Sequence, residues 1–189
     1  MRIVAGKHRG AKLAAPEGLD VRPTHERVRE ALFSMLESGR FGPVLRDRVV
    51  LDLFAGTGAM GLEALSRGAA RAVLVDTHPA ALDALRANVA KLRVEGTAQV
   101  RSGDATRWHE RAAEPAGVVF MDPPYDTGAW VPALEAADRA DWIGDDTVVV
   151  IETGKRETVP PPDGYEVLED RSYGRARITI LAKVSMADG

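Results

Sequence analysis

Residues 51–61 read LDLFAGTGAMG, an apolar run that contains one acid and leads into a glycine-rich turn and a helix-forming segment. Gly56, Gly58 and Gly61 match the pattern G-x-G-x-x-G, which is typical of the first strand–turn–helix unit of nucleotide-binding α/β folds. One match of this pattern is weak evidence by itself. The surrounding residues therefore have to indicate what this turn binds.

Strand-like and helix-like segments alternate on both sides of the turn. Apolar runs predict strands over residues 48–54, 71–76, 99–101, 118–121, 147–152, 165–170 and 175–183. Helical spacing predicts helices from Thr24 to about residue 38, over 60–67, from Thr77 to about 92 and over 129–140, with Thr24 and Thr77 as N-caps. Such alternation is typical of a parallel sheet with helices on both faces. We therefore expect a doubly wound α/β fold with a seven-stranded, mostly parallel sheet that ends in an antiparallel pair.

Composition limits the class of protein. The chain has 189 residues, of which 45% are hydrophobic, and this size fits one globular domain with a small appendage. It has no cysteine, and its four histidines show no metal-binding spacing, so neither disulfides nor a metal site are expected. No apolar stretch is long enough for a signal peptide or a membrane span, which predicts a cytoplasmic protein without a membrane partner.

The beginning of the chain is basic, although the whole chain carries a net charge of −3. Residues 1–22 contain two short β-prone pieces around residues 7–10, and they predict a hairpin extension ahead of a main domain over residues 23–189. The basic residues within residues 1–29, that is, in this extension and at the start of the next helix, are Arg2, Lys7, Arg9, Lys12, Arg22, Arg27 and Arg29. A basic segment on an acidic body favours contact with a polyanion, while charge placed only for solubility is the alternative.

Carboxylates follow three successive predicted strands, where α/β sheets bind their ligands. Asp52 would repel the pyrophosphate of a dinucleotide but attract a cation, and S-adenosylmethionine carries an ammonium and a sulfonium group without any phosphate. We expect Asp76 to accept hydrogen bonds from the ribose hydroxyls. Asp104 is expected to accept from the adenine amino group, with a helix cap as the alternative. The remaining residues of this predicted cofactor site are Phe54, Ala55, Gly56, Gly58 and Ala105, and Phe54 could equally well fill the core.

A second unusual stretch, VVFMDPPYD, occupies residues 118–126. Its apolar half predicts a buried strand, but Asp122, Pro123 and Tyr125 do not suit the continuation of a central strand. The stretch therefore predicts a rigid turn that places an acid and an aromatic ring at a strand end.

Together, LDLFAGTGAMGLEALSRGA and MDPPY resemble the class I S-adenosylmethionine-dependent methyltransferases that modify exocyclic or amide nitrogens. The segment RIVAGKHRGAKLAAPEGLDVRPTHERVREALF narrows the resemblance to the RsmD family, which methylates N2 of a guanine in 16S ribosomal RNA. The resemblance covers residues 2–126 strongly. It implies a Rossmann-like fold, S-adenosylmethionine as cofactor and 16S ribosomal RNA within a small-subunit particle as partner, and we expect a monomer.

The resemblance also implies roles for the second stretch. Asp122 and the carbonyl of Pro123 would hold the two N–H groups of the guanine amine and aim its lone pair at the methyl group. Tyr125 would stack on the base. We expect Asp122 to have an ordinary pKa, of about 3.9, and to accept a hydrogen bond rather than act as a strong base.

Three other functions stay open at this point. A DNA adenine-N6 methyltransferase has the same tetrapeptide, although 189 residues leave little room for a DNA-reading domain. An NAD-dependent oxidoreductase fits the glycine pattern but is disfavoured by Asp52. A non-enzymatic RNA-binding module would need only the basic segment.

Overall fold

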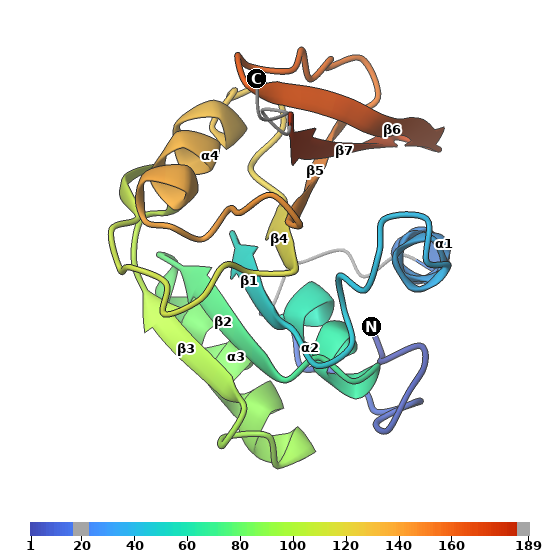
Figure 1. Cartoon of the computed structure of the whole chain (residues 1–189). Helices are drawn as coiled ribbons and strands as arrows, with labels where there is room; N and C mark the ends of the chain where they lie inside the picture. The colour runs from blue at the N-terminus through green and yellow to red at the C-terminus, as the bar shows by residue number, and fades with distance from the viewer. Residues whose placement is uncertain (17–22, 185–189) are drawn as a thin grey trace.

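Seven strands form one sheet in the order β3-β2-β1-β4-β5-β7-β6 (Figure 1). The computed structural model describes residues 1–16 and 23–184. The strands are β1 Val49–Leu53, β2 Arg71–Asp76, β3 Ala98–Ser102, β4 Val118–Met121, β5 Val148–Gly154, β6 Tyr165–Tyr173 and β7 Ala176–Lys183. Strands β1 to β5 pair in parallel, and β7 is antiparallel to both of its neighbours, β5 and β6. The predicted fold class is therefore confirmed.

The strand order reverses between β1 and β4. From β1 the chain moves outward to β2 and β3, then returns to place β4 against the other side of β1. Loops that leave β1 and β4 at their carboxyl ends consequently diverge, and ligands of doubly wound sheets bind in the crevice between such loops. Both unusual stretches of the sequence lie at this switch point.

In the described part of the chain, four α-helices cover the two faces of the sheet. They are α1 Pro23–Glu37, α2 Ala59–Ser66, α3 Pro79–Leu92 and α4 Trp130–Arg139, and a 3-10 turn, η1, spans Ala105–Arg107. Side chains of β1 alternate between the two faces: Val50 packs in the cluster that contains residues of α1, α2 and α3, and Leu51 packs in the cluster that contains residues of α4. Each strand of the centre is thus buried on both sides.

Two predicted helix caps are wrong by one or two residues. Thr24 lies inside α1, which begins at Pro23. The helix α3 begins at Pro79 with His78 as its N-cap, so Thr77 precedes the cap. Proline is favoured in the first turn of a helix because the N–H that it lacks has no partner there, and both helices use one.

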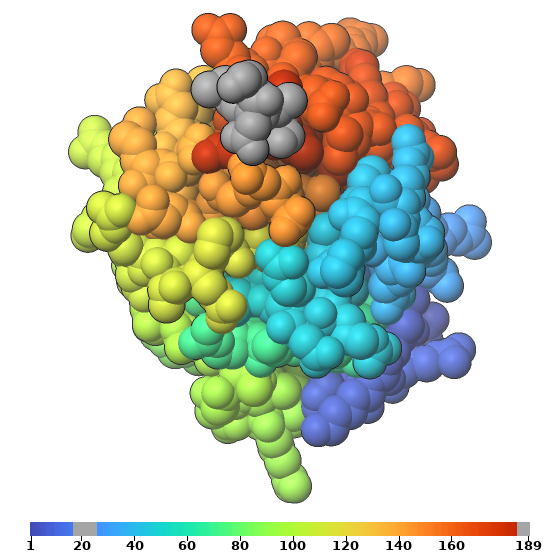
Figure 2. Space-filling view, in the orientation of Figure 1, coloured from blue at the N-terminus to red at the C-terminus, as the bar shows by residue number. Residues whose placement is uncertain are grey.

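The N-terminal segment, residues 1–16, is less regular than the predicted hairpin but more firmly attached. A single antiparallel bridge joins Arg2 and Lys12, and turns occupy the residues between them. Ile3 and Leu13 are buried in the same hydrophobic core as the helices on that face. Figure 2 shows this segment, in dark blue, packed flush against the body of the molecule. It is therefore an integral part of the domain, while the expected boundary at residue 22 lies outside the described residues.

Among the described residues, no helix is both long and apolar enough to cross a membrane.

Candidate active site

Acidic side chains gather at the carboxyl edge of the sheet. Asp52 and Asp76 come from β1 and β2. Met121 of β4 pairs with Ile151 of β5, so Asp122 and Glu152 are the next residues on two adjacent strands. The charge of Asp52 raises the pKa of Asp122, so the acids that follow β1 and β4 lie close enough to interact. We refer to these four carboxylates as the acidic cluster.

The glycine loop, residues 54–58 after β1, has backbone conformations that residues with a side chain rarely adopt. Gly56 and Gly58 have φ values of 56° and 81°, in the left-handed region. A Cβ on Gly58 would lie 2.3 Å from Cδ1 of Leu85, whereas a Cβ on Gly56 would meet nothing within 4 Å. Gly58 is thus packed against α3, while Gly56 presents open backbone to the carboxyl edge.

Gly61 allows α2 to pack closely against the sheet, and it is not needed for a turn of the backbone. A Cβ there would lie 2.2 Å from Cδ2 of Leu74 and 3.3 Å from Oδ2 of Asp52. Its N–H donates a hydrogen bond of 2.9 Å to Oδ2 of Asp52. The third glycine of the pattern therefore brings the first turn of α2 against β1 and β2.

Asp52 is buried, with 2% of its surface exposed. Burial raises the pKa of Asp52 to about 7, although the hydrogen bond from Gly61 opposes this rise and the charge of Asp76 adds to it. Asp52 thus lies beneath the glycine loop and organises it. Its carboxylate lies under the loop and does not extend into solvent, so it can act on a ligand at the carboxyl edge through its charge.

Asp76 fixes the other side of the same loop. Its Oδ2 accepts a hydrogen bond of 2.8 Å from the N–H of Gly56, and its Oδ1 accepts one of 2.8 Å from the N–H of His78. The side chain is partly exposed. It therefore joins the glycine loop to the start of α3 while remaining accessible from the crevice.

Asp104 caps the turn η1, which was the alternative that the sequence left open. Its Oδ1 accepts hydrogen bonds from the N–H and the Oγ1 of Thr106, at 2.9 and 2.7 Å. These bonds lower the pKa of Asp104 below its ordinary value. Ala105 is buried beside it, and Phe54 is half-buried against the core cluster on the α4 face.

The turn after β4 holds the second group of predicted residues. Pro123 is buried, and Tyr125 is 43% exposed. The hydroxyl of Tyr125 donates a hydrogen bond of 3.1 Å to Oε1 of Glu152. A Cβ on Gly154 would lie 3.6 Å from Cγ of Tyr125, so the ring lies directly over the backbone of β5. The aromatic ring is thereby held in place on one side and accessible on the other.

The pKa of Asp122 differs from the expectation. Solvent reaches part of this side chain, yet protein surrounds the carboxylate closely enough to raise the pKa of Asp122 well above its ordinary value. Burial is the main cause, followed by the charges of Glu152 and Asp52. The prediction of an ordinary pKa is therefore wrong, because protein atoms desolvate the carboxylate and neighbouring strands add like charges. Burial and Glu152 also raise the pKa of Tyr125.

Glu152 was missed by the sequence analysis. It occupies the end of the apolar run VVVIE in β5, the same pattern that drew attention to Asp52 and Asp122. Its significance depends on β5 lying next to β4, which the order of strands in the chain does not reveal. An acid at the end of each apolar strand was the available signal.

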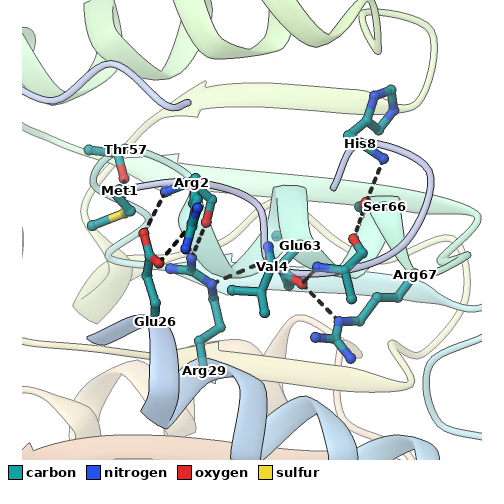
Figure 3. Close-up of polar contacts among 12 residues, drawn as sticks. Met1, Arg2, Val4, His8, Glu26, Arg29, Thr57, Glu63, Ser66 and Arg67 are labelled. Carbon is teal, nitrogen blue, oxygen red and sulfur yellow. Dashed lines mark hydrogen bonds and ion pairs between the residues drawn. The ribbon is translucent and has the colours of Figure 1, made fainter. Parts of the chain in front are cut away.

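The predicted RNA-binding cations divide into two groups. Lys7, Arg9, Lys12 and Arg27 are exposed, and Arg2 is exposed but paired with Glu26 at 3.1 Å. Arg29 is buried, and its Nε lies 3.4 Å from Oε2 of Glu63 (Figure 3). The prediction that Arg29 contacts RNA is therefore wrong, since its charge is used inside the protein. Arg22 lies outside the described residues.

The exposed loop of the N-terminal segment lies away from the acidic cluster. The N–H of Lys7 donates to the backbone oxygen of Ser66 at 2.8 Å. The N–H of His8 donates to the Oγ of Ser66 at 2.9 Å (Figure 3). Ser66 is the last residue of α2, a helix that begins beside the glycine loop and runs back along the sheet. Contacts from this loop would thus reach RNA at some distance from the carboxyl edge.

The residues present fit a cationic ligand that carries hydroxyl groups. The acidic cluster would repel a pyrophosphate, and the open backbone at Gly56 leaves room for a ligand above the loop. Asp76 offers carboxylate oxygens on the side of β2, where a ribose is bound in nucleotide sites. These carboxylate acceptors therefore suit S-adenosylmethionine better than NAD.

Comparisons with known proteins agree with this geometry. The model of a family described as "Conserved hypothetical protein 95" matches residues 1–182. The Ribosomal RNA small subunit methyltransferase D of Escherichia coli K12 is 37% identical over 100% of this chain and 92% of its own. The protein of that name from Haemophilus influenzae is 28% identical, over 92% and 89%. A solved structure from Escherichia coli has a TM-score of 0.81 at 34% identity and covers 97% of each chain.

Proposed function

This chain belongs to the RsmD family, and from that premise we propose that it transfers a methyl group from S-adenosylmethionine to the exocyclic N2 of a guanine in 16S ribosomal RNA. Ribosomal RNA methylation is the activity named for its relatives. The observation that carries the finer proposal is the position of Asp122, Pro123 and Tyr125. They leave β4 beside the glycine loop, because Met121 pairs with Leu53.

The cofactor would lie over the glycine loop. When bound, S-adenosylmethionine supplies a methyl group on a positively charged sulfur. Asp76 would accept the ribose hydroxyls, and Asp104 the adenine amino group. Asp52 would stabilise the positive charge from beneath the loop. Each of these three residues already anchors a backbone N–H, so the acceptors are held in position before the ligand arrives.

The residues after β4 would orient the base. Tyr125 presents one face of its ring for stacking, which stabilises an unpaired base by about 1–3 kcal/mol. The carboxylate of Asp122 and the carbonyl of Pro123 would accept the two N–H groups of N2. This arrangement would direct the nitrogen lone pair toward the methyl group, and acceptors that are already held in position are effective because they need no reorganisation.

The proton of N2 needs an acceptor during the transfer. Methylation would make the amine nitrogen acidic, so a neighbouring group would have to take up one of its two protons. Asp122 is the acceptor in position. Its raised pKa makes it a stronger base than an ordinary aspartate, and proton transfer is more effective when the base has a pKa nearer to the working pH.

Recognition of the ribosomal RNA would use exposed cations of the N-terminal segment and α1. Lys7, Arg9, Lys12 and Arg27 are exposed. Arg2, Arg9 and Arg27 also line an open groove of about 440 Å³ between the N-terminal segment and α1. Phosphate contacts of this kind position an RNA without reading its sequence. A small-subunit particle would add the shape that such contacts lack.

The test uses isotopically labelled S-adenosylmethionine and small-subunit ribosomal RNA, free and assembled, followed by mass spectrometry of the nucleosides. We expect labelled N2-methylguanosine. Asp122→Ala should abolish most of it and leave cofactor affinity nearly unchanged, while the exposed Asp145→Ala should behave as the unaltered protein. A parallel incubation with DNA serves as the alternative substrate, and label found in its N6-methyladenine, with none in guanine of the RNA, would contradict the proposal.

A further inference from the structure

Glu152 lies beside Tyr125, the ring on which the target base would stack. It follows Ile151, whose partner Met121 precedes Asp122, and neighbouring strands are about 4.8 Å apart. The hydroxyl of Tyr125 bonds to its Oε1. The carboxylate of Asp122 and the ring of Tyr125, just after β4, therefore lie beside the carboxylate of Glu152 in the adjacent strand β5.

Two carboxylates side by side repel each other, and the charge of Glu152 adds to the effect of burial in raising the pKa of Asp122. A ligand that offers several hydrogen-bond donors in a row would relieve this repulsion. The edge of guanine does so, because its N1–H lies beside the amino group of N2. Adenine and 2-aminopurine present an unprotonated N1, whose lone pair would face a carboxylate.

We propose that Glu152 accepts a hydrogen bond from N1–H of the target guanine and thereby selects guanine over purines that lack this donor; the proposal rests on the function proposed above. Asp122 and Pro123 hold N2, and Glu152 holds the neighbouring ring nitrogen. A carboxylate has about four lone-pair positions, so it accepts from N1–H while it also accepts from Tyr125. The bond from Tyr125 fixes the rotamer of Glu152 before the base arrives.

This arrangement makes a specific demand on the substrate. A site built to bond a donor rejects an analogue without that donor, because the acceptor then faces a lone pair in place of an N–H group. The base 2-aminopurine keeps the reactive amino group of guanine but lacks N1–H. It therefore separates recognition of N1 from the chemistry at N2.

The experiment begins with an RNA in which the methylated nucleotide has been mapped and which is then remade with 2-aminopurine at that nucleotide. The unaltered protein should methylate the guanine RNA at least about tenfold faster, as kcat/KM, than the 2-aminopurine RNA. Glu152→Gln should reduce or invert this ratio, because its amide still accepts from Tyr125 and now donates to an unprotonated N1. Glu166→Gln, an exposed change on β6, should leave the ratio unaltered.

The outcomes are distinguishable. Equal rates of the unaltered protein on both RNAs, or a ratio unchanged in folded Glu152→Gln, would overturn the role of Glu152 and leave the proposed function standing. Absence of N2-methylguanosine from every RNA would overturn the proposed function and the role of Glu152 with it. Thermal denaturation and cofactor titration establish that Glu152→Gln is folded, and the comparison of the two RNAs with the unaltered protein does not depend on any variant.

Discussion

Nε of Arg29 lies 3.4 Å from Oε2 of Glu63, and both side chains are almost completely buried (Figure 3). The same carboxylate accepts the N–H groups of Val4 and Ala5, at 2.8 and 3.0 Å, and the Nε of Arg67 at 2.8 Å. Glu63 thus joins α1, α2 and the N-terminal segment at one point. Because α2 begins at the glycine loop, this connection also supports the candidate cofactor site.

Replacement of Glu63 tests the strength of this connection. Glu63→Gln should lower the free energy of unfolding by about 3–5 kcal/mol, because two buried guanidinium groups lose the charge that compensates them. Urea denaturation measures the change. The control is Glu135→Gln, which breaks an exposed pair with Arg139 at 3.7 Å and should cost at most about 1 kcal/mol. Equal losses of unfolding free energy in the two variants would show that the buried ion pair stabilises the protein no more than the exposed one.

The exposed cations of the N-terminal loop should act on RNA alone. In Lys7→Ser with Arg9→Ser, RNA affinity should fall, and the slope of its logarithm against that of the salt concentration should flatten by up to about one unit per cation. Affinity for S-adenosylmethionine should not change, since this loop is anchored at the far end of α2. Filter binding at several salt concentrations measures the slope, with Arg139→Ser on α4 as control. An unaltered slope would place the RNA contacts elsewhere.

The third glycine of the loop should not tolerate even a methyl group. In Gly61→Ala the new Cβ would lie 2.2 Å from Cδ2 of the fully buried Leu74. Overpacking of this kind costs about 1–3 kcal/mol, and it should weaken cofactor binding by displacing Asp52. Gly96→Ala, where a Cβ meets nothing within 4 Å, is the matched control. Thermal denaturation of both variants measures the difference, and similar melting temperatures would contradict the packing argument.

The raised pKa of Asp52 should appear in the pH dependence of stability. The folded protein holds this proton up to about pH 7, whereas an unfolded aspartate loses it near pH 4. The folded state binds more protons between these values, so this group makes stability fall as the pH rises through the window. Asp52→Asn should remove that part of the fall, while the exposed Asp145→Asn should retain it. Unfolding free energies from pH 4 to 8 decide the matter, and identical curves would be the contrary result.

Much of the fold was predictable from the sequence because its signals are local. The apolar runs and their alternation with helical segments depend on nearest neighbours, and β2 and β4 have the bounds that were expected. The same holds for the glycine loop and for the turn at Asp122, since the residue types at a strand end largely determine what the backbone can do there. The position of the site at the carboxyl edge could also be predicted, because parallel strands have their carboxyl ends at the same edge of the sheet.

Only the tertiary structure decided what depends on residues distant in the chain. A count of charges treats Arg29 as a solvated cation, but its burial arises from packing against Glu63, 34 positions away. An aspartate read by itself has an ordinary pKa, yet that of Asp122 is raised by burial and by carboxylates on β5 and β1. Glu152 gains its place beside Asp122 from the pairing of β4 with β5. Sequence determines local conformation, whereas desolvation and Coulomb interactions depend on which elements meet, and those are properties of the folded chain.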